Sequence, residues 1–571
     1  MRALEARRGK RWRWAGFATA LVLALATFAG AAWAQSDDDP VDDPAPTAGG
    51  PGYVPTKLIA DLGFRPDPDG FSFENYGNNT GALNLGPNEM RQLFGPGVCE
   101  NPSSSTCRLT PPAAGWAAQA NQSMAGGHCV GFAVSSMILF QRPQNRMRFG
   151  GDTTFAIPFA GNANVQGFIA YAFTYQLLPQ VNPVELSPAQ AIAYLQQAFS
   201  QGSADAPTLG ISKLDASGEQ TAGHRITPVA LDNLGNGKFN ILVYDNNYPG
   251  VVRTVAVDQF ANTWSYEASP NPSEPSDTYA GTGSVNRMRF TPTRLLGVQP
   301  CPFCEGARAD DQVRLEGRFS DHGDLLIQDA NGRRLGSVDG HQVDEMPAGS
   351  MQQLDMNRVW LGEDEPLYRI PASGGYTISL IGRLHHPDRE RVSLVGPGIS
   401  LRVSNILLNP GQTDRVRVSG DGHRVSYQTG DVRGENPTIE LGVQEPGADH
   451  TFKFRQLDET VPGERVQFSN NEARNRLTIT NPGRNARNHF AITIRRVTGS
   501  GVVRFTNRHV DLSPGERFVI SYGSFNRDGE SITAEEILGG KRRTVRLKDS
   551  GPAAVVPVSR CGSSCGVKRV V

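Results

Sequence analysis

The chain has 571 residues, of which 38% are hydrophobic and 20% are charged, and its formal net charge at pH 7 is −1. Such a charge balance offers no basic excess that would attract nucleic acid, so we expect no nucleic-acid partner. The length suffices for several hydrophobic cores, and about three or four domains are expected.

Residues 1–34 are typical of a secretory signal peptide. A basic start, MRALEARRGKRWRW, leads into the apolar stretch AGFATALVLALATFAG, and small residues at Ala32 and Ala34 predict cleavage after Ala34. The apolar stretch is short for a membrane span and no second one follows, so a secreted chain without a membrane segment after cleavage is expected. An uncleaved anchor is the alternative. The mature chain then carries a net charge of −6.

Residues 35–52, QSDDDPVDDPAPTAGGPG, are acidic and rich in proline and glycine. Repulsion between aspartates and the lack of apolar side chains leave nothing with which to build a core. This segment is therefore interpreted as a linker.

The seven cysteines divide into three close pairs and one single residue. In an oxidising compartment the close pairs predict disulfides, namely Cys99 with Cys107, Cys301 with Cys304, and Cys561 with Cys565. An alternative is a zinc site made by the last two pairs, which their wide separation in the sequence disfavours. Cys129 is the cysteine left over.

Cys129 is predicted to lie in the first turn of a helix, because the apolar run 130–140 follows the turn-forming pair Gly126 and Gly127. The N-terminus of a helix presents unpaired N–H groups and a positive dipole end, which favour a thiolate over a thiol. Cys129 is thus a candidate nucleophile. The alternative is a small buried hydrophobic residue.

His224 is the candidate base for this nucleophile. Of the ten histidines only His128 and His224 precede residue 300, and the ring of His128, next to Cys129 on the helix, would not readily reach the sulfur. His224 opens a predicted strand, GHRITPVAL, and after a turn at 234–237 a second strand, KFNILVYD, ends with Asp245. Asp245 is the candidate that orients the imidazole, with Asn246 as its alternative; a plain polar turn also fits these residues.

Three motifs in this order, GGHC opening a helix, GH opening a strand and a polar residue ending the next strand, resemble the papain-like cysteine peptidase superfamily. The resemblance covers residues 53–300 and implies an α+β, two-lobed domain with Cys129 as nucleophile, His224 as general base and acid, and Asp245 as orienting residue. It also implies that Gln122 donates to the oxyanion, with Asn121 or Gln119 as alternatives because the spacing of Gln122 departs by one residue from the usual pattern.

Further features of this region fit a helical lobe followed by a strand-rich one. Val130 stands where the family usually has tryptophan, which favours a distant branch. Ser187 and Pro188 predict a helix closed by Gly202, residues 207–214 predict a strand, and the opening segment FRPDPDGFSFENYGNN is interpreted as a covering loop. CHAP-type cell-wall amidases also resemble GHCVGFAV followed by GHRI, but their domains are usually shorter than this region.

Beyond Cys304 the sequence is typical of all-β sandwich domains, with short alternating stretches broken by Gly, Asn, Asp and Pro. The pairs Pro410-Gly411, Pro462-Gly463 and Pro514-Gly515 recur at a constant interval and suit type II turns. We therefore expect a β-rich module at 301–395, β-sandwich repeats at 396–550 and a C-terminal tail with a cysteine pair at 551–571. Two or three small sandwiches are favoured over a propeller for residues 311–550.

These features together predict a secreted papain-like cysteine peptidase without a cofactor or metal. Its expected partners are a protein or peptide substrate and, through the β modules, a cell-surface or cell-wall component. The alternatives are a CHAP-like amidase and a non-catalytic surface or adhesion protein whose papain-like domain is inactive.

Overall fold

A computed structural model of the chain describes residues 53–551 apart from residues 215, 217, 219, 268–277, 295, 305–309, 317–322, 339–340, 357–365, 373, 383–387, 431–434, 446, 459, 461, 484–486 and 500. The predicted signal peptide, linker and C-terminal tail lie outside these residues. Among the helices that are described, none is long and apolar enough to cross a membrane.

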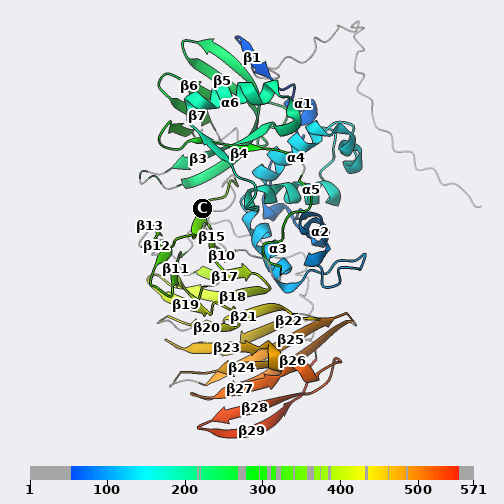
Figure 1. Cartoon of the computed structure of the whole chain (residues 1–571), viewed down its shortest axis with the longest axis vertical. Coiled ribbons are helices and arrows are strands. Elements are labelled where there is room, and N and C mark those ends of the chain that lie inside the picture. The colour runs from blue at the N-terminus through cyan, green and yellow to red at the C-terminus, as the bar shows by residue number, and fades with distance from the viewer. Residues whose placement is uncertain are drawn as a thin grey trace, which may run out of the picture. The chain divides into compact units, whose positions relative to one another are not determined.

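A small helical region comes first in the described chain and a larger antiparallel β region follows it (Figure 1). The α-helices are α1 (Pro66–Asp69), α2 (Pro87–Phe94), α3 (Pro111–Ser123), α4 (Cys129–Gln141), α5 (Ala163–Phe173) and α6 (Pro188–Ser200). Short 3-10 helices lie at Asn78–Thr80, Pro96–Val98, Pro143–Phe149, Thr174–Leu177, Ser203–Asp205, Glu472–Arg474 and Tyr522–Ser524.

Helix α4 is the central helix of the first region. Residues Cys129 to Leu139 are all buried, and they contribute to three apolar clusters on different sides of the helix. A helix that is apolar all round is stable only when other elements surround it. The sequence prediction of a buried helix beginning at Cys129 is confirmed.

Helix α6 begins where the sequence predicts. Ser187 accepts a hydrogen bond from the Gln190 N–H while the Gln190 side chain bonds back to the Ser187 N–H, which forms a capping box ahead of Pro188 at the first helical position. The buried face of α6, with Ile192, Leu195 and Phe199, packs on the first sheet.

The first sheet has nine strands in the described residues, ordered β2-β9-β3-β4-β5-β6-β7-β8 with β1 paired to β4. All pairs are antiparallel. The strands are β1 (Leu58–Asp61), β2 (Val184–Leu186), β3 (Pro207–Leu214), β4 (Gln220–Gly235), β5 (Lys238–Tyr244), β6 (Val252–Asp258), β7 (Thr263–Glu267), β8 (Thr278–Thr282) and β9 (Met288–Pro292).

The β4–β5 hairpin places His224 near the start of one strand and Asp245 just after the end of the other. Its tight turn contains Asn236 and Gly237 at φ values of 51° and 72°, which Asn and Gly adopt most readily. Thr227 pairs with Tyr244 in the register of the hairpin, so Asp245 follows directly alongside the stretch that contains His224. The predicted strands at 207–214, from residue 223 and at 238–244 are confirmed.

Two further antiparallel sheets make up the C-terminal region. One has the order β14 (Ser350–Gln352), β15 (Leu367–Pro371), β10 (Asp310–Glu316), β17 (Asp388–Gly396), β18 (Ile399–Leu408), β21 (Thr438–Glu445), β22 (Ala448–Gln456), β25 (Asn488–Thr498), β26 (Gly501–Leu512). The other has the order β13 (His341–Asp344), β12 (Arg334–Val338), β11 (Asp324–Asp329), β16 (Tyr376–Ile381), β19 (Thr413–Val418), β20 (Arg424–Gln428), β23 (Arg465–Asn471), β24 (Arg476–Thr480), β27 (Arg517–Ser521), β28 (Ile532–Leu538), β29 (Lys541–Leu547).

These sheets are continuous, and here the structure differs from the expected two or three separate sandwiches. Hairpins alternate between the sheets along the chain, and each hairpin pairs with the preceding one in the same sheet, so no break arises at residue 396. Buried side chains from both sheets, between Leu325 and Leu547, form one hydrophobic core. The recurring Pro-Gly turns precede β19, β23 and β27, with Gly411, Gly463 and Gly515 at φ values of 76°, 72° and 78°.

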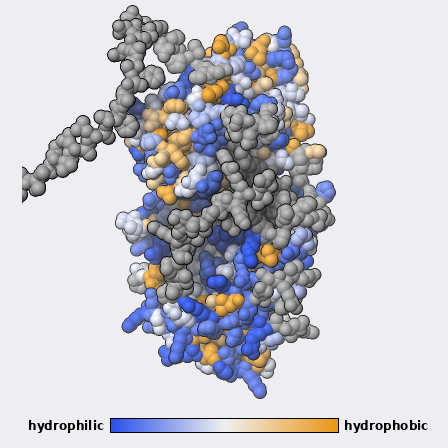
Figure 2. All heavy atoms as spheres, turned by 180° about the vertical axis from the view of Figure 1, so that it is seen from behind, coloured by the Kyte–Doolittle hydropathy of each residue, from blue (hydrophilic) through white to orange (hydrophobic). Residues whose placement is uncertain are grey.

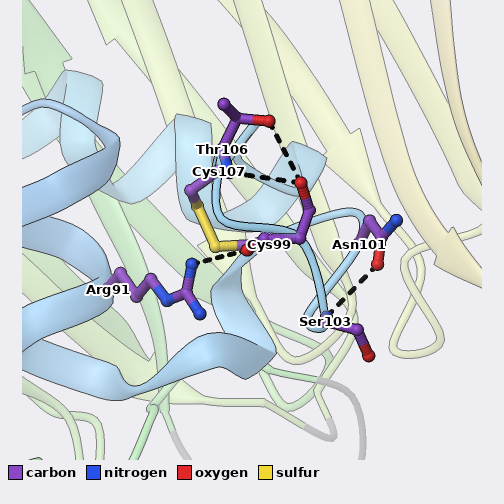
Figure 3. Close-up of a disulfide and its surroundings, with 7 residues drawn as sticks. Arg91, Cys99, Asn101, Ser103, Thr106 and Cys107 are labelled. Carbon is purple, nitrogen blue, oxygen red and sulfur yellow. Dashed lines mark hydrogen bonds between the residues drawn. A yellow bond between two sulfur atoms is a disulfide. The ribbon is translucent and has the colours of Figure 1, made fainter. Parts of the chain in front are cut away.

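Two of the three predicted disulfides are present, Cys99–Cys107 and Cys301–Cys304. The third pair lies outside the described residues. The first disulfide closes a loop that the Arg91 side chain also holds by donating to the Ser104 carbonyl at 2.8 Å (Figure 3). Disulfides of this kind indicate an oxidising environment.

Hydrophobic residues occur in small groups among hydrophilic ones on the face drawn in Figure 2. Isolated exposed apolar side chains such as Phe260 and Met147 are ordinary for a folded surface. We assign them no role.

Candidate active site

Cys129 is the first residue of α4, and it is the free cysteine of the described chain. Its N–H lies in the first turn, where helical N–H groups have no partner inside the helix. Gly127, two residues earlier, has a φ of 144°, a conformation that favours glycine. The chain therefore turns sharply just before the thiol, as the sequence predicts.

His224, on β4, lies beside this thiol and is bound on its other side by Asp245. His224 Nε2 is 2.8 Å from Asp245 Oδ1. The Cys129 thiol interacts with the same ring and contributes to its pKa. Asp245 occupies Nε2. The other ring nitrogen, Nδ1, has no nitrogen or oxygen partner within the described residues, so it is the ring atom that can face the sulfur.

The Asp245 carboxylate is held on both oxygens. Oδ1 also accepts from the Asn247 N–H at 2.9 Å, and Oδ2 accepts from the Tyr266 hydroxyl on β7. His224 and Asp245 are both fully buried. The sequence did not single out Asn247 or Tyr266, because β7 is remote in the sequence and Tyr266 is one of 13 tyrosines in the chain.

Burial and ion pairing act in opposite directions on the two side chains. Burial lowers the pKa of His224, but the charge and hydrogen bond of Asp245 and the Cys129 thiol outweigh it and raise that pKa to about 10. For Asp245, burial raises the pKa, and the opposing charge of His224 with the hydrogen bonds to the carboxylate brings it below its ordinary value. These two shifts favour an imidazolium paired with a carboxylate.

Asn246 and His128 have other contacts. The Asn246 amide donates to the Cys129 carbonyl at 3.3 Å and to the Arg225 carbonyl at 3.0 Å, so it joins α4 to β4. The His128 ring nitrogens lie 2.5 Å from the Tyr76 carbonyl oxygen and 2.8 Å from Asn84 Oδ1. Of the two predicted orienting residues, Asp245 is the one that contacts His224.

The predicted oxyanion donors lie in the last turns of α3. Gln122 is half-buried, and its carbonyl accepts from the Ala125 N–H. The Gln119 amide donates to Ser393 Oγ on β17 at 3.0 Å, and the Asn121 side chain bonds the main chain of Leu85. The two alternatives therefore have partners elsewhere, and the role of Gln122 stays a prediction.

Asn75, which the sequence did not single out, has a side chain that is bonded to the residue before the nucleophile. It belongs to the segment interpreted as a covering loop, and its Oδ1 accepts from the His128 N–H at 2.7 Å. Its Nδ2 is buried without a partner among the described residues and lies 3.0 Å from the position that a Cβ on Gly127 would take. A buried donor without an acceptor is rare in folded proteins and marks a place where an acceptor is expected.

A segment of the C-terminal region packs against the turn before the nucleophile and against the strand that carries His224. Cys129 is fully buried and shares an apolar cluster with Leu354 and Met356. A Cβ on Gly127 would overlap the Met356 carbonyl oxygen, and the Met356 N–H donates to the Gly223 carbonyl, next to His224, at 3.1 Å.

Within the residues described, no group of three or more His, Cys, Asp or Glu side chains is placed to hold a metal ion.

Comparisons with known proteins identify no relative. No protein-family model, no curated protein and no solved structure matches the chain.

Proposed function

We propose that the chain is a secreted cysteine peptidase of papain-like type, in which Cys129 attacks the carbonyl carbon of a peptide bond. The observation that carries this proposal is a buried arrangement of three side chains. The Cys129 thiol lies at a helix N-terminus, His224 interacts with it, and Asp245 is bound to His224 Nε2 at 2.8 Å. A nucleophile, a base and a group that orients the base are the parts that acyl transfer requires.

In this mechanism the Cys129 thiolate adds to the carbonyl carbon and forms a tetrahedral intermediate. The His224 imidazolium gives its Nδ1 proton to the amine nitrogen, the C–N bond breaks, and an acyl thioester remains. Water then adds to the thioester and passes a proton to His224, and breakage of the C–S bond releases the acid and restores the ion pair. Asp245 stays ionised throughout and holds the imidazole in place.

The negative charge that develops on the carbonyl oxygen needs donors. The Cys129 N–H at the start of α4 is one, and the resemblance assigns Gln122 as the other. Asn75 is the stronger candidate, because its Nδ2 is buried, unpartnered and next to Gly127. A side-chain amide that is already fixed when charge develops stabilises the transition state most effectively.

The proposal is tested by incubating the mature chain and its Cys129→Ala variant with an unfolded protein such as carboxymethylated casein, and mapping the products by mass spectrometry. New peptide termini with the wild-type chain alone support the peptidase. Parallel incubation with purified peptidoglycan tests the amidase, which would release muropeptides instead. If neither substrate is cut and both chains bind a cell surface equally, the chain is a non-catalytic binding protein.

A further inference from the structure

Residues 354–356 belong to the C-terminal region, and Asp355 lines a groove together with Val130 and Val134 of α4 and Arg225 of β4. Leu354, Asp355 and Met356 are 4%, 2% and 4% exposed, although no helix or strand includes them. The Met356 side chain packs on Gly126, with its Cε 3.6 Å from the position of a Cβ there. A short irregular segment this deeply buried requires specific partners for its main chain.

Those partners come from both sides of the groove. The Gln176 amide makes a two-way contact with Asp355, accepting from its N–H at 2.9 Å and donating to its carbonyl at 3.2 Å. On the other side the Met356 N–H donates to the Gly223 carbonyl at 3.1 Å. Main-chain contacts of this kind do not depend on the side chains that the bound segment carries, so another extended peptide could make them.

The Asp355 side chain is recognised by two converging arginines. Its Oδ2 accepts from Arg225 Nη2 at 2.6 Å, and its Oδ1 accepts from Arg289 Nη2 at 2.5 Å. Arg225 is buried and follows His224 directly in the sequence, and its Nη1 donates to Thr291 at 2.8 Å. Two guanidinium groups held by further contacts and aimed at one carboxylate form a charge-assisted anion site.

Two glycines, which have no side chain, make room for the segment. A Cβ on Gly223 would lie 2.8 Å from Asp355 Oδ1, and a Cβ on Gly210 would lie 2.8 Å from Asp355 Oδ2. A cavity of about 220 Å³ continues from the segment and is lined by Val130, next to the nucleophile, as well as by both arginines. The groove thus extends from the first turn of α4, which begins at Cys129, to the two arginines.

We infer that Arg225 and Arg289 form a subsite for an acidic side chain of an extended polypeptide, and that Asp355 of the chain itself occupies this subsite as an intramolecular ligand. The inference rests on the proposed function, because it takes the groove beside Cys129 as the substrate groove. The substrate class is then an extended peptide whose Asp or Glu side chain takes the place of Asp355, one residue before the position of Met356. It also implies that the segment must leave before substrate enters.

The inference is tested by peptide binding in the full mature chain, with Cys129→Ala in every variant so that no turnover occurs. The probes are acetyl-QQLDM-amide, which copies residues 352–356, and acetyl-QQLNM-amide. With Asp355→Asn in the chain, we expect the Asp peptide to bind about tenfold or more tighter than the Asn peptide, because hydrogen bonds between charged groups are roughly twice as strong as neutral ones.

Two comparisons complete the binding test. The chain that retains Asp355 is expected to bind the Asp peptide at least about tenfold more weakly, because its own carboxylate competes. Adding Arg289→Gln is expected to abolish the preference for the Asp peptide. Equal affinity for both peptides, or no binding of either to the Asp355→Asn chain, would overturn the inference and leave the segment a structural contact. Because only binding is read, this result does not depend on whether the chain hydrolyses anything.

A second variant keeps the test decisive if Asp355→Asn prevents folding. Leu354→Ser with Met356→Ser weakens the apolar contacts of the segment and retains its carboxylate. With Cys129 present, this variant is expected to react with iodoacetamide at least about tenfold faster than wild type, and the Asp peptide but not the Asn peptide should slow the reaction. An unchanged rate would contradict the inference. Glu345→Gln, which removes an exposed carboxylate from the same β region, is the control.

Discussion

His224 Nε2 and Asp245 Oδ1 are joined by a 2.8 Å hydrogen bond between two side chains that are both fully buried. The β4–β5 hairpin creates this contact between residues separated by 21 positions. It fixes which imidazole nitrogen is left to face the Cys129 thiol.

The ion pair between His224 and Asp245 should make stability depend on pH. The pKa of His224 is raised to about 10, so its contribution is complete below about pH 6.5 and disappears as the pH rises through about 10. The pKa of Asp245 is lowered, so its contribution is present above about pH 3.9 and is lost as the pH falls below that.

Asp245→Asn is therefore expected to lower the free energy of unfolding by about 3–5 kcal/mol near pH 6, because it leaves a buried charge without its partner. The difference from wild type should shrink above about pH 10, where His224 becomes neutral. Urea unfolding at both pH values measures this. A difference that is the same at both would show that the pair is not ionised.

Asn75→Asp is expected to reduce kcat on a cleaved peptide by about 10²–10³-fold or more. The substitution keeps an oxygen that can accept from the His128 N–H and replaces the amide donor by a carboxylate oxygen, which repels a developing oxyanion. Gln122→Ala is the matched comparison and should change kcat little. The reverse order of effects would assign the oxyanion to Gln122, as the family resemblance implies.

Glu435 provides a second pH-sensitive group, in the core of the two C-terminal sheets. Its carboxylate accepts from Tyr427 at 2.6 Å and from Gln412 at 2.7 Å. Burial and then the charge of Asp414 raise its pKa to about 8. An acid whose pKa is raised by folding destabilises the protein as the pH rises from its unfolded pKa towards its folded one.

Wild type should thus lose stability between about pH 5 and 8 relative to Glu435→Gln, which cannot ionise. Chemical unfolding of both chains at these two pH values gives the difference. Glu345→Gln, at an exposed site, controls for the loss of a carboxylate. If the difference in unfolding free energy between wild type and Glu435→Gln stays constant with pH, Glu435 is not protonated in the folded protein.

The Cys99–Cys107 disulfide should stabilise the fold by about 2–3 kcal/mol, the value expected for closing a loop this short. Cys99 is 2% exposed and belongs to the same apolar cluster as Trp116 on α3. Replacing both cysteines by serine should lower the urea midpoint, and adding a reductant should then have less further effect than it has on wild type. A midpoint that does not change would show that the loop is held by its other contacts.

The sequence predicted the parts of the site that depend on local pattern. The apolar run after Gly127 located the helix that begins at Cys129, and the predicted strand KFNILVYD placed Asp245 at the end of the strand next to that of the histidine. Asn75 and Asp355 were not predicted, because their importance arises from tertiary contacts with residues far away in the sequence. Asn75 contacts His128, and Asp355 contacts Arg225. The constant Pro-Gly interval indicated a repeat, but strand order was needed to see that the repeats share two continuous sheets.

The measurement that tests the central claim most directly is the alkylation of Cys129 by iodoacetamide between about pH 5 and 9, in wild type and in His224→Ala. The ratio of rates at acid and alkaline pH is the quantity of interest, since burial of the thiol slows both. A thiolate paired with imidazolium predicts labelling that persists below about pH 7 in wild type and is lost in His224→Ala. If both chains follow the profile of an ordinary thiol, with half-maximal reactivity near about pH 8.5, His224 does not activate Cys129 and the chain is not a thiol hydrolase.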